Sequence, residues 1–162
     1  MKKFKITAIS ILLLSLPFFT SCSSDDDGSN VPGGDTFIRY TVDGVTYEYS
    51  NIITAESAGI TINGEISNSG DADYSFISIW FPLDLQTGTY SFSGDPFQDG
   101  DYKLNLESNP LNITDEWAVS GDITIETVNA DVIAGTFTAT IFDDDGNSVN
   151  MVNGEFDAVN VD

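Results

Sequence analysis

The sequence contains no histidine, a single cysteine and only five basic residues among its 162 positions. Histidine is the side chain that most often transfers protons or binds metals near neutral pH, so chemistry that depends on it is excluded. One cysteine excludes a disulfide within the chain and any zinc site built from several thiolates. Among the usual catalytic groups, carboxylates are the ones that the chain holds in abundance.

Positive charge is scarce and lies mostly at the start of the chain. Three of the five basic residues occur in the first five positions, whereas all 26 acidic residues follow Cys22. A chain that began at Cys22 would keep only Arg39 and Lys103 as basic side chains. Nucleic acid and anionic lipid are polyanions, so neither is expected as an electrostatic partner.

The N-terminal segment has the pattern of a bacterial export signal. A basic start is followed by Ile6–Thr20, 15 mostly apolar residues. A membrane-spanning helix needs about 20 such residues, so this run predicts a signal peptide over residues 1–21. Its end, Phe19-Thr20-Ser21-Cys22, resembles a bacterial lipobox, in which small residues precede the cysteine that begins the mature chain. Phe19 stands where lipoboxes usually have leucine.

The resemblance to lipoproteins implies that the thiol of Cys22 carries a glyceryl lipid through a thioether. Each buried CH₂ contributes about 0.8 kcal/mol to membrane binding, so two or three acyl chains hold a protein on a bilayer stably. The membrane is then a partner through the lipid anchor. The alternative is a free cysteine at the end of an uncleaved helix.

Residues 22–36 predict a lipidated cysteine followed by a flexible acidic linker. The segment is polar and rich in glycine, and its 14 residues after Cys22 span about 20 Å. Its first five residues are similar to the acidic export signal of Bacteroidetes surface lipoproteins: Ser23, Ser24, Asp25, Asp26 and Asp27. The resemblance implies an outer-membrane lipoprotein exposed on the cell surface. The alternative is a linker that is only solvated.

Residues 37–162 predict one all-β domain. They lack helical periodicity and are rich in β-branched and aromatic residues, broken by Gly, Asn and Asp. Asp43-Gly44 between two strand-like runs predicts a hairpin. Residues 74–81 are apolar at nearly every position, which predicts a central strand and places Trp80 in the core. About nine strands with close turns predict an antiparallel β-sandwich or a small β-barrel, and the sandwich is favoured.

The last third of the domain has the clearest alternation. Trp117 shares its parity with Ile123, which places this tryptophan in the core as well. In the final strand Val152 and Phe156 are expected to point inward. A break in the alternation before them predicts a bulge, for which Gly154 is suited.

Residues 120–156 resemble the end of small uncharacterised Bacteroidetes lipoproteins. The shared elements are a strand led by glycine, then Gly-Thr-Phe, then a strand that ends in Asn-Gly-x-Phe. Here they are Gly121, Gly135-Thr136-Phe137 and Asn153-Gly154-Glu155-Phe156. That group has no assigned activity, so the resemblance implies fold and location alone.

One acidic segment, Phe142–Asn147, contains candidates for calcium ligands in Asp143, Asp145 and Asn147. Calcium prefers six to eight oxygen ligands, often from clustered carboxylates. The EF-hand pattern fails, because alignment on its glycine puts an isoleucine at the first ligand position. A hairpin turn is therefore the favoured interpretation, and no cofactor is expected.

Two other sets of side chains could carry a function. The first is aromatic and could stack on sugar rings, although core packing is favoured for its tryptophans: Trp80, Trp117, Tyr47, Tyr49 and Tyr102. The second is a set of carboxylates, mostly on the polar parity of strands, among which no catalytic pair stands out: Glu65, Glu107, Glu116 and Glu126.

The favoured hypothesis is a lipid-anchored, non-catalytic domain of the envelope or cell surface whose ligand is unknown. The candidate partners are a glycan or another envelope protein. The alternative is a glycan-binding accessory module of a polysaccharide uptake system. A third hypothesis is a hydrolase that uses carboxylates, in the manner of glycosidases.

Overall fold

The structure, a computed structural model, describes residues 36–94 and 100–161. The predicted signal peptide, Cys22, the acidic residues 23–27 and the linker to residue 35 lie outside the described residues. The described strands are β1 (Phe37–Val42), β2 (Val45–Ser50), β3 (Ile53–Glu56), β4 (Ile60–Ile66), β5 (Ser75–Phe81), β6 (Gly88–Ser91), β7 (Lys103–Ser108), β8 (Ile113–Trp117), β9 (Ser120–Val128), β10 (Val132–Phe142) and β11 (Ser148–Val159).

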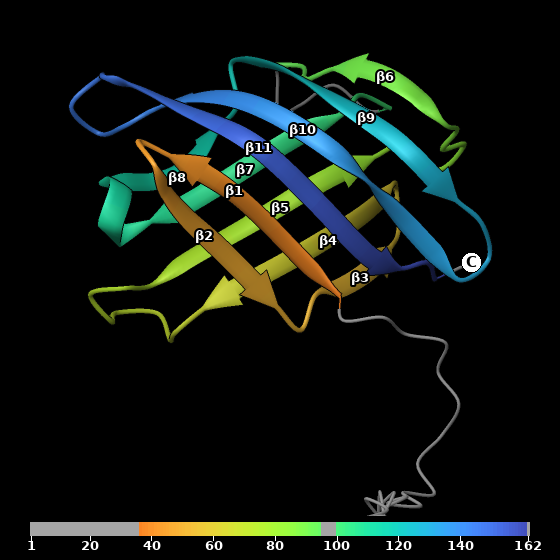
Figure 1. Cartoon of the computed structure of the whole chain (residues 1–162), viewed down its shortest axis with the longest axis horizontal. Helices are drawn as coiled ribbons and strands as arrows, with labels where there is room; N and C mark the ends of the chain where they lie inside the picture. The colour runs from red at the N-terminus through yellow and green to blue at the C-terminus, as the bar shows by residue number, and fades with distance from the viewer. Residues whose placement is uncertain (1–35, 95–99, 162) are drawn as a thin grey trace, which may run out of the picture. The chain divides into compact units, whose positions relative to one another are not determined.

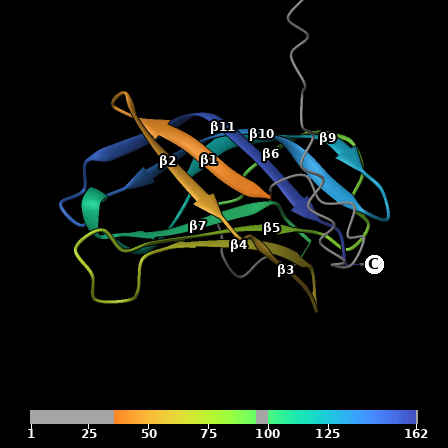
Figure 2. The ribbon, with the colours of Figure 1, turned by 60° about the horizontal axis from the view of Figure 1, so that its bottom comes forward.

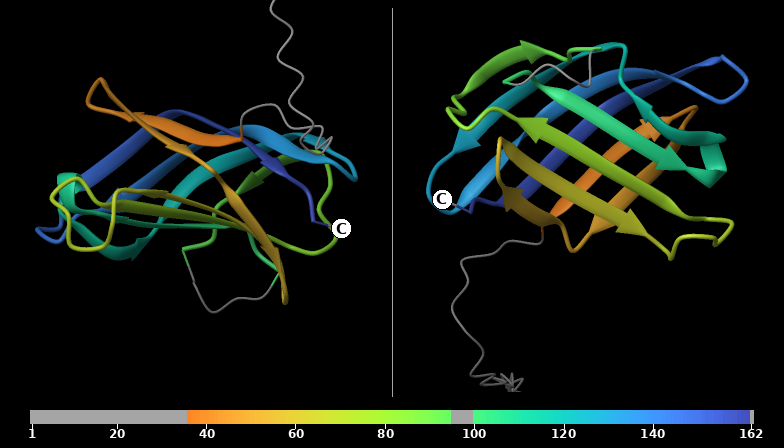
Figure 3. Two further views of the ribbon diagram at one scale, coloured as in Figure 1. Left: turned by 90° about the horizontal axis from the view of Figure 1, so that it is seen from below. Right: turned by 180° about the vertical axis from the view of Figure 1, so that it is seen from behind.

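The strands form two antiparallel sheets that pack face to face (Figures 1 and 2). The six-stranded sheet has the order β2-β1-β11-β10-β9-β6, and the five-stranded sheet has the order β3-β4-β5-β7-β8. Figure 3 shows the five-stranded sheet in front when the molecule is seen from behind. The two sheets are not closed into a barrel, so the preference for a sandwich is confirmed.

Residues 36–94 and 100–161 contain eleven strands, whereas nine were expected. The two additions, β3 and β8, lie at the edges of the five-stranded sheet and have four and five residues. Both are short, and neither has the regular alternation of apolar and polar residues that marks a strand in a sequence. Within the described residues, no helix is long and apolar enough to cross a membrane.

The hairpin predicted at Asp43-Gly44 is present. Val42 pairs directly with Val45, so the connection between β1 and β2 has two residues. Asp43 and Gly44 have φ angles of 50° and 81°, as the type I′ turn of tight hairpins requires.

The Gly-Thr-Phe and Asn-Gly-x-Phe elements pack against each other in the centre of the six-stranded sheet. Gly135 pairs directly with Phe156, and Phe137 pairs directly with Gly154. A Cβ on Gly154 would lie 2.6 Å from Cγ of Phe137, and one on Gly135 would lie 2.9 Å from Cζ of Phe156. Each ring therefore covers the glycine on the opposite strand, a cross-strand arrangement that fixes register.

A chain of hydroxyl groups joins the two sheets through the core. The Tyr40 and Tyr49 hydroxyls lie 3.0 Å apart, and the Tyr49 hydroxyl lies 2.6 Å from Oγ of Ser75. Ser75 in turn donates to the carbonyl oxygen of Glu107. Burial of Tyr40 raises its pKa well above the usual value, and burial raises the pKa of Tyr49 to about 12.

One end of the sandwich is closed by contacts between the β10–β11 turn and the start of β8. The Asp144 carboxylate accepts hydrogen bonds from the backbone N–H and the hydroxyl of Thr114, at 3.0 and 2.9 Å. The backbone N–H of Asp144 donates to the carbonyl oxygen of Asn112. The turn of one sheet is thereby fixed to the edge strand of the other.

The predicted bulge is present in β11, but its position differs from the expected one. The register with β10 shifts between Phe137 and Ala139, and Asn153 has a φ of 52°. The extra residue turns Val152 outward, so the prediction that Val152 points into the core is wrong. Phe156 points inward, as expected.

Candidate functional site

The outer face of the five-stranded sheet presents two tryptophans side by side. Trp80 lies on β5 and Trp117 at the end of β8, with β7 between their strands. Their ring centroids are 6.0 Å apart, and the ring planes meet at 58°. Trp80 is 39% exposed and Trp117 is half-buried. We call the surface around these two rings the tryptophan face.

The prediction that both tryptophans belong to the core is wrong, for two different reasons. β5 is the central strand of its sheet, as predicted, but Trp80 lies on its outer side. Trp117 shares its parity with Ile123, yet the chain passes from one sheet to the other between them, at Ala118 and Val119. The alternation therefore does not continue from β8 into β9.

A row of polar side chains runs across the sheet beside the tryptophans. Register places Asn63, Ser78, Asn105 and Trp117 opposite one another on successive strands β4, β5, β7 and β8. Ser78 donates to Oδ1 of Asn63 at 2.7 Å. Ser78 and Asn105 are both buried, so these hydrogen-bonded side chains lie beneath the tryptophan face.

Asp115 supplies a carboxylate at the edge of the tryptophan face. It lies at a bulge where the register between β7 and β8 shifts, and its φ is 51°. Bulges re-aim side chains. Here the Asp115 carboxylate accepts a hydrogen bond from Nδ2 of Asn105 at 2.9 Å, while the same amide group contacts the carbonyl oxygen of Glu116. The carboxylate is thus held next to Trp117.

A small hollow of about 80 Å³ adjoins Trp80 on the same side of the sheet. It is lined by Ala58, Gly59, Phe81, Gly100, Asp101 and Lys103 together with Trp80. Its volume holds only a few atoms, so a ligand on the tryptophan face could place one substituent in it.

The other aromatic candidates lie elsewhere. Tyr49 is fully buried and Tyr102 nearly so, and Tyr102 stacks on Tyr90 with centroids 4.1 Å apart. Tyr47 stacks on Tyr40 at the edge of the six-stranded sheet. A platform of five aromatics is therefore not formed, and of these five candidates only the two tryptophans lie together on the outer face of a sheet.

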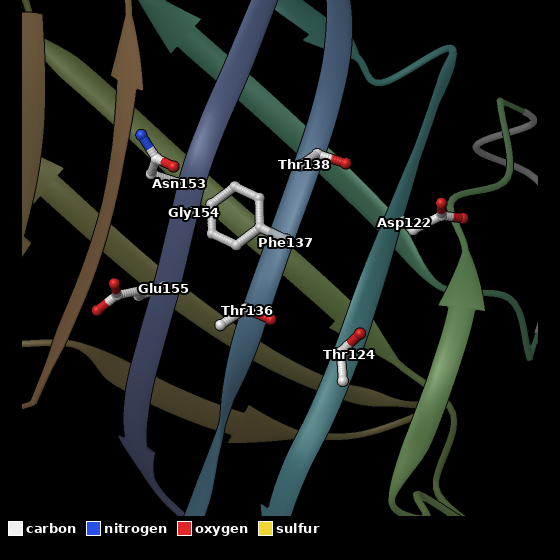
Figure 4. A pocket seen from close by; sticks show the side chains of 8 residues that line it. All are labelled: Asp122, Thr124, Thr136, Phe137, Thr138, Asn153, Gly154 and Glu155. Carbon is white, nitrogen blue, oxygen red and sulfur yellow. The ribbon is translucent and has the colours of Figure 1, made fainter.

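A second depression, of about 400 Å³, lies on the outer face of the six-stranded sheet (Figure 4). Three threonines line its floor, namely Thr124, Thr136 and Thr138, while Asp122 and Glu155 stand on opposite sides of it. The two carboxylates lie on β9 and β11, with β10 between them, so their Cα atoms are roughly 10 Å or more apart.

We call this hollow the threonine depression. Both of its carboxylates already accept hydrogen bonds from other side chains. Glu155 forms an ion pair with Arg39, and Asp122 accepts a hydrogen bond from Ser91 at 2.8 Å. Sequence reasoning missed Asp122 and Glu155, because only strand register brings residues from β9 and β11 together. No local sequence signal could have found them.

The carboxylates that the sequence singled out do not gather in one cleft. Register places Glu65 and Glu107 on either side of Phe76 in a row across the outer face of the five-stranded sheet. Glu116 lies on edge strand β8, and Glu126 lies on β9 in the other sheet.

The acidic segment at Asp143–Asn147 forms the predicted hairpin turn. Oδ1 of Asp143 accepts hydrogen bonds from the backbone N–H groups of Asn147 and Asp145, at 2.7 and 3.1 Å. Hydrogen bonds from Asn147 lower the pKa of Asp143. Asp145 accepts a hydrogen bond from Asn112. Throughout the part of the chain that the structure describes, no three acidic residues are grouped to hold a metal ion.

Comparison of the chain with protein-family models, curated proteins and solved structures finds no match. A function can thus be argued only from the sequence and the geometry of this chain.

Proposed function

We propose that the chain is a lipid-anchored, non-catalytic β-sandwich displayed on the outer membrane, exposed at the cell surface. The observation that carries the proposal is the position of the only cysteine, directly after an apolar run too short to span a bilayer. Strand β1 begins at Phe37, so 14 residues lie between Cys22 and the sandwich. A polar segment of that length is a suitable tether.

The hydrogen bonds of two carboxylates in the sandwich support a role without catalysis. Asp122 and Glu155, which face each other across the threonine depression, are engaged by Ser91 and Arg39. A glycosidase needs one carboxyl group that is free to donate a proton and a second that acts on the sugar or on water.

Lipid anchoring can be tested by metabolic labelling with a palmitate analogue. The native chain is expected to incorporate the label and the variant Cys22→Ser to lose it, with both chains detected at their expected sizes. Labelling of the variant, or no labelling of the native chain, would contradict the proposal. Cys22→Ala serves as a second variant that also removes the thiol nucleophile.

Surface display is tested separately by protease treatment of whole cells. The native chain is expected to be degraded while a periplasmic control protein survives. Replacement of Asp25, Asp26 and Asp27 by asparagine keeps Cys22 and the linker length but removes the acidic signal. This variant is expected to stay labelled and to become protected, and equal degradation would argue against an export role of the aspartates.

A second candidate function is a glycan-binding accessory module of a polysaccharide uptake system. The observation that favours it is the tryptophan face, which combines exposed aromatic surface with fixed polar groups. Electrophoresis of the native domain in gels that contain single polysaccharides tests it, because a bound polysaccharide slows migration. Unchanged mobility in every gel would count against this function.

A further inference from the structure

We propose that the tryptophan face binds one ring of an uncharged sugar, with Asp115 as the hydrogen-bond acceptor for its hydroxyls. This inference rests on the second candidate function and names its site and ligand class. The site consists of Trp80, Trp117 and Asp115, supported from beneath by Asn105.

The chemistry of the three side chains fits a sugar ring. One face of a pyranose presents C–H bonds with partial positive charge, which are attracted to the negative face of an aromatic ring. The edge of the same ring carries hydroxyl groups that need hydrogen-bond partners once water is removed. An indole for the C–H face and a neighbouring carboxylate for the hydroxyls supply both.

Asp115 is held ready for this role before any ligand arrives. Its Oδ1 is fixed by Nδ2 of Asn105, a side chain that is itself buried. A carboxylate has about four lone-pair positions, so this hydrogen bond leaves capacity to accept from sugar hydroxyls. Because its orientation is fixed already, binding would cost little side-chain entropy at this residue.

The angle between the indoles limits contact to one sugar ring. The two rings are tilted by 58° with centroids 6.0 Å apart, so they contact each other and do not form a flat shelf. A sugar ring that stacks on the exposed face of one indole therefore cannot stack on the other as well. An extended chain of rings would need two roughly coplanar aromatics to stack on both.

Charge selects against acidic glycans. Asp115 lies on the same face as Trp117, and Asp101 and Lys103 both line the hollow beside Trp80, so carboxylates outnumber ammonium groups at the site. The chain has 26 acidic against five basic residues. Uronic acids and sulfated sugars would therefore be repelled, whereas an uncharged sugar meets hydrogen-bond partners without a charge penalty.

The chain is well suited to a direct test, because Trp80 and Trp117 are its only tryptophans. The tryptophan fluorescence of the residue 22–162 chain, excited at a wavelength that its six tyrosines do not absorb, reports on this face alone. We expect a saturable change in emission with at least one uncharged probe among glucose, mannose, galactose and their linear hexasaccharides. Hexagalacturonic acid should produce no saturable change at the same concentrations.

The length of the probe tests the single-ring geometry. Six equivalent rings raise the apparent affinity by about sixfold through statistics alone, so a hexasaccharide should bind no more than about tenfold more tightly than its monosaccharide. An increase of a hundredfold would overturn the single-ring inference, because it would require several rings to be contacted at once.

Variants identify the site. Trp80→Ala and Asp115→Asn should each lower the affinity for the positive probe at least tenfold, measured by titration calorimetry on chains that circular dichroism shows to be folded. Phe142→Ala removes an exposed aromatic from the end of β10, on the other sheet, and should bind like the native chain. Trp117→Phe, which keeps an aromatic ring if Trp117→Ala does not fold, should retain partial binding.

Three outcomes would overturn the inference: no response to any uncharged probe, equal binding of hexagalacturonic acid, or native affinity in the Trp80 and Asp115 variants. None of these outcomes affects lipid labelling at Cys22. The proposal of a lipid-anchored domain and the proposal of a sugar site are therefore tested independently.

Discussion

The reciprocal packing of Phe137 and Gly154 predicts that a single added methyl group destabilises the whole sandwich. In Gly154→Ala the new Cβ would lie 2.5 Å from the carbonyl oxygen of Phe137 and 2.6 Å from its Cγ. Both distances are far below van der Waals contact. The Phe137 ring is 3% exposed and has little room to turn away, so β10 and β11 must separate.

The expected cost is about 2–3 kcal/mol, the upper part of the usual range for overpacking a core. For a domain of this size, 1 kcal/mol shifts the melting temperature by about 4 °C, so a fall of roughly 8–12 °C is expected. Calorimetry or circular dichroism on the residue 22–162 chain measures the difference. The fluorescence of Trp80 and Trp117 provides a second probe of the same transition.

Gly94→Ala is the matched control. It adds the same methyl group where the nearest atoms, on Val119, lie 3.6 Å away, an ordinary contact. This variant should melt within about 2 °C of the native chain. A Gly154→Ala variant as stable as the control would refute the reasoning, because strands β10 and β11 would then have to be less closely packed at this pair than the structure indicates.

Three further predictions concern pH, the closed end of the sandwich and metal. The pKa of Tyr49 is raised to about 12, so the native state keeps a proton that the unfolded chain releases near pH 10. The contribution of Tyr49 to stability should therefore be constant below pH 10 and fall by about 3 kcal/mol toward pH 12, measured by urea unfolding. The fall should be smaller in Tyr49→Phe, and parallel pH profiles of the two chains would contradict this. Asp144→Ala removes two hydrogen bonds from Thr114 and should lower the free energy of unfolding by about 1 kcal/mol. Asp145→Ala should lower it by less, and the reverse order would show that Asp144 does not fix the turn to β8. The melting midpoint should not change when calcium is replaced by chelator, and an increase with calcium would revive the candidate ligands at Asp143 and Asn147.

Local patterns in the sequence were sufficient for the fold class. Asp-Gly at residues 43–44 favours the positive φ angles that a two-residue hairpin turn requires. The alternation in residues 132–142 predicts that one face of β10 points inward. The central position of β5 followed from its apolar composition. These features depend on neighbours along the chain, and such interactions are readable from one sequence.

The candidate site could not be predicted in the same way. Trp80 and Trp117 are 37 positions apart, and only the pairing of β5 with β7 and of β7 with β8 brings them together. Alternation assigns a residue to one of two faces but does not say which face a second sheet covers. Val152 was misplaced for a related reason, since the bulge at Asn153 changes the parity of every residue before it.

The first strand begins where the last one finishes, because Phe37 pairs with Asp157. The entry and exit points of the folded body are therefore neighbours, which is the arrangement that tolerates circular permutation and insertion into a host loop. A short peptide joining residues 161 and 36, with new ends opened at the exposed Gly70 turn, should yield the same fold. A fluorescent protein fused after residue 161 would therefore lie next to the start of β1, where the linker joins the sandwich, rather than at the opposite end of the sandwich.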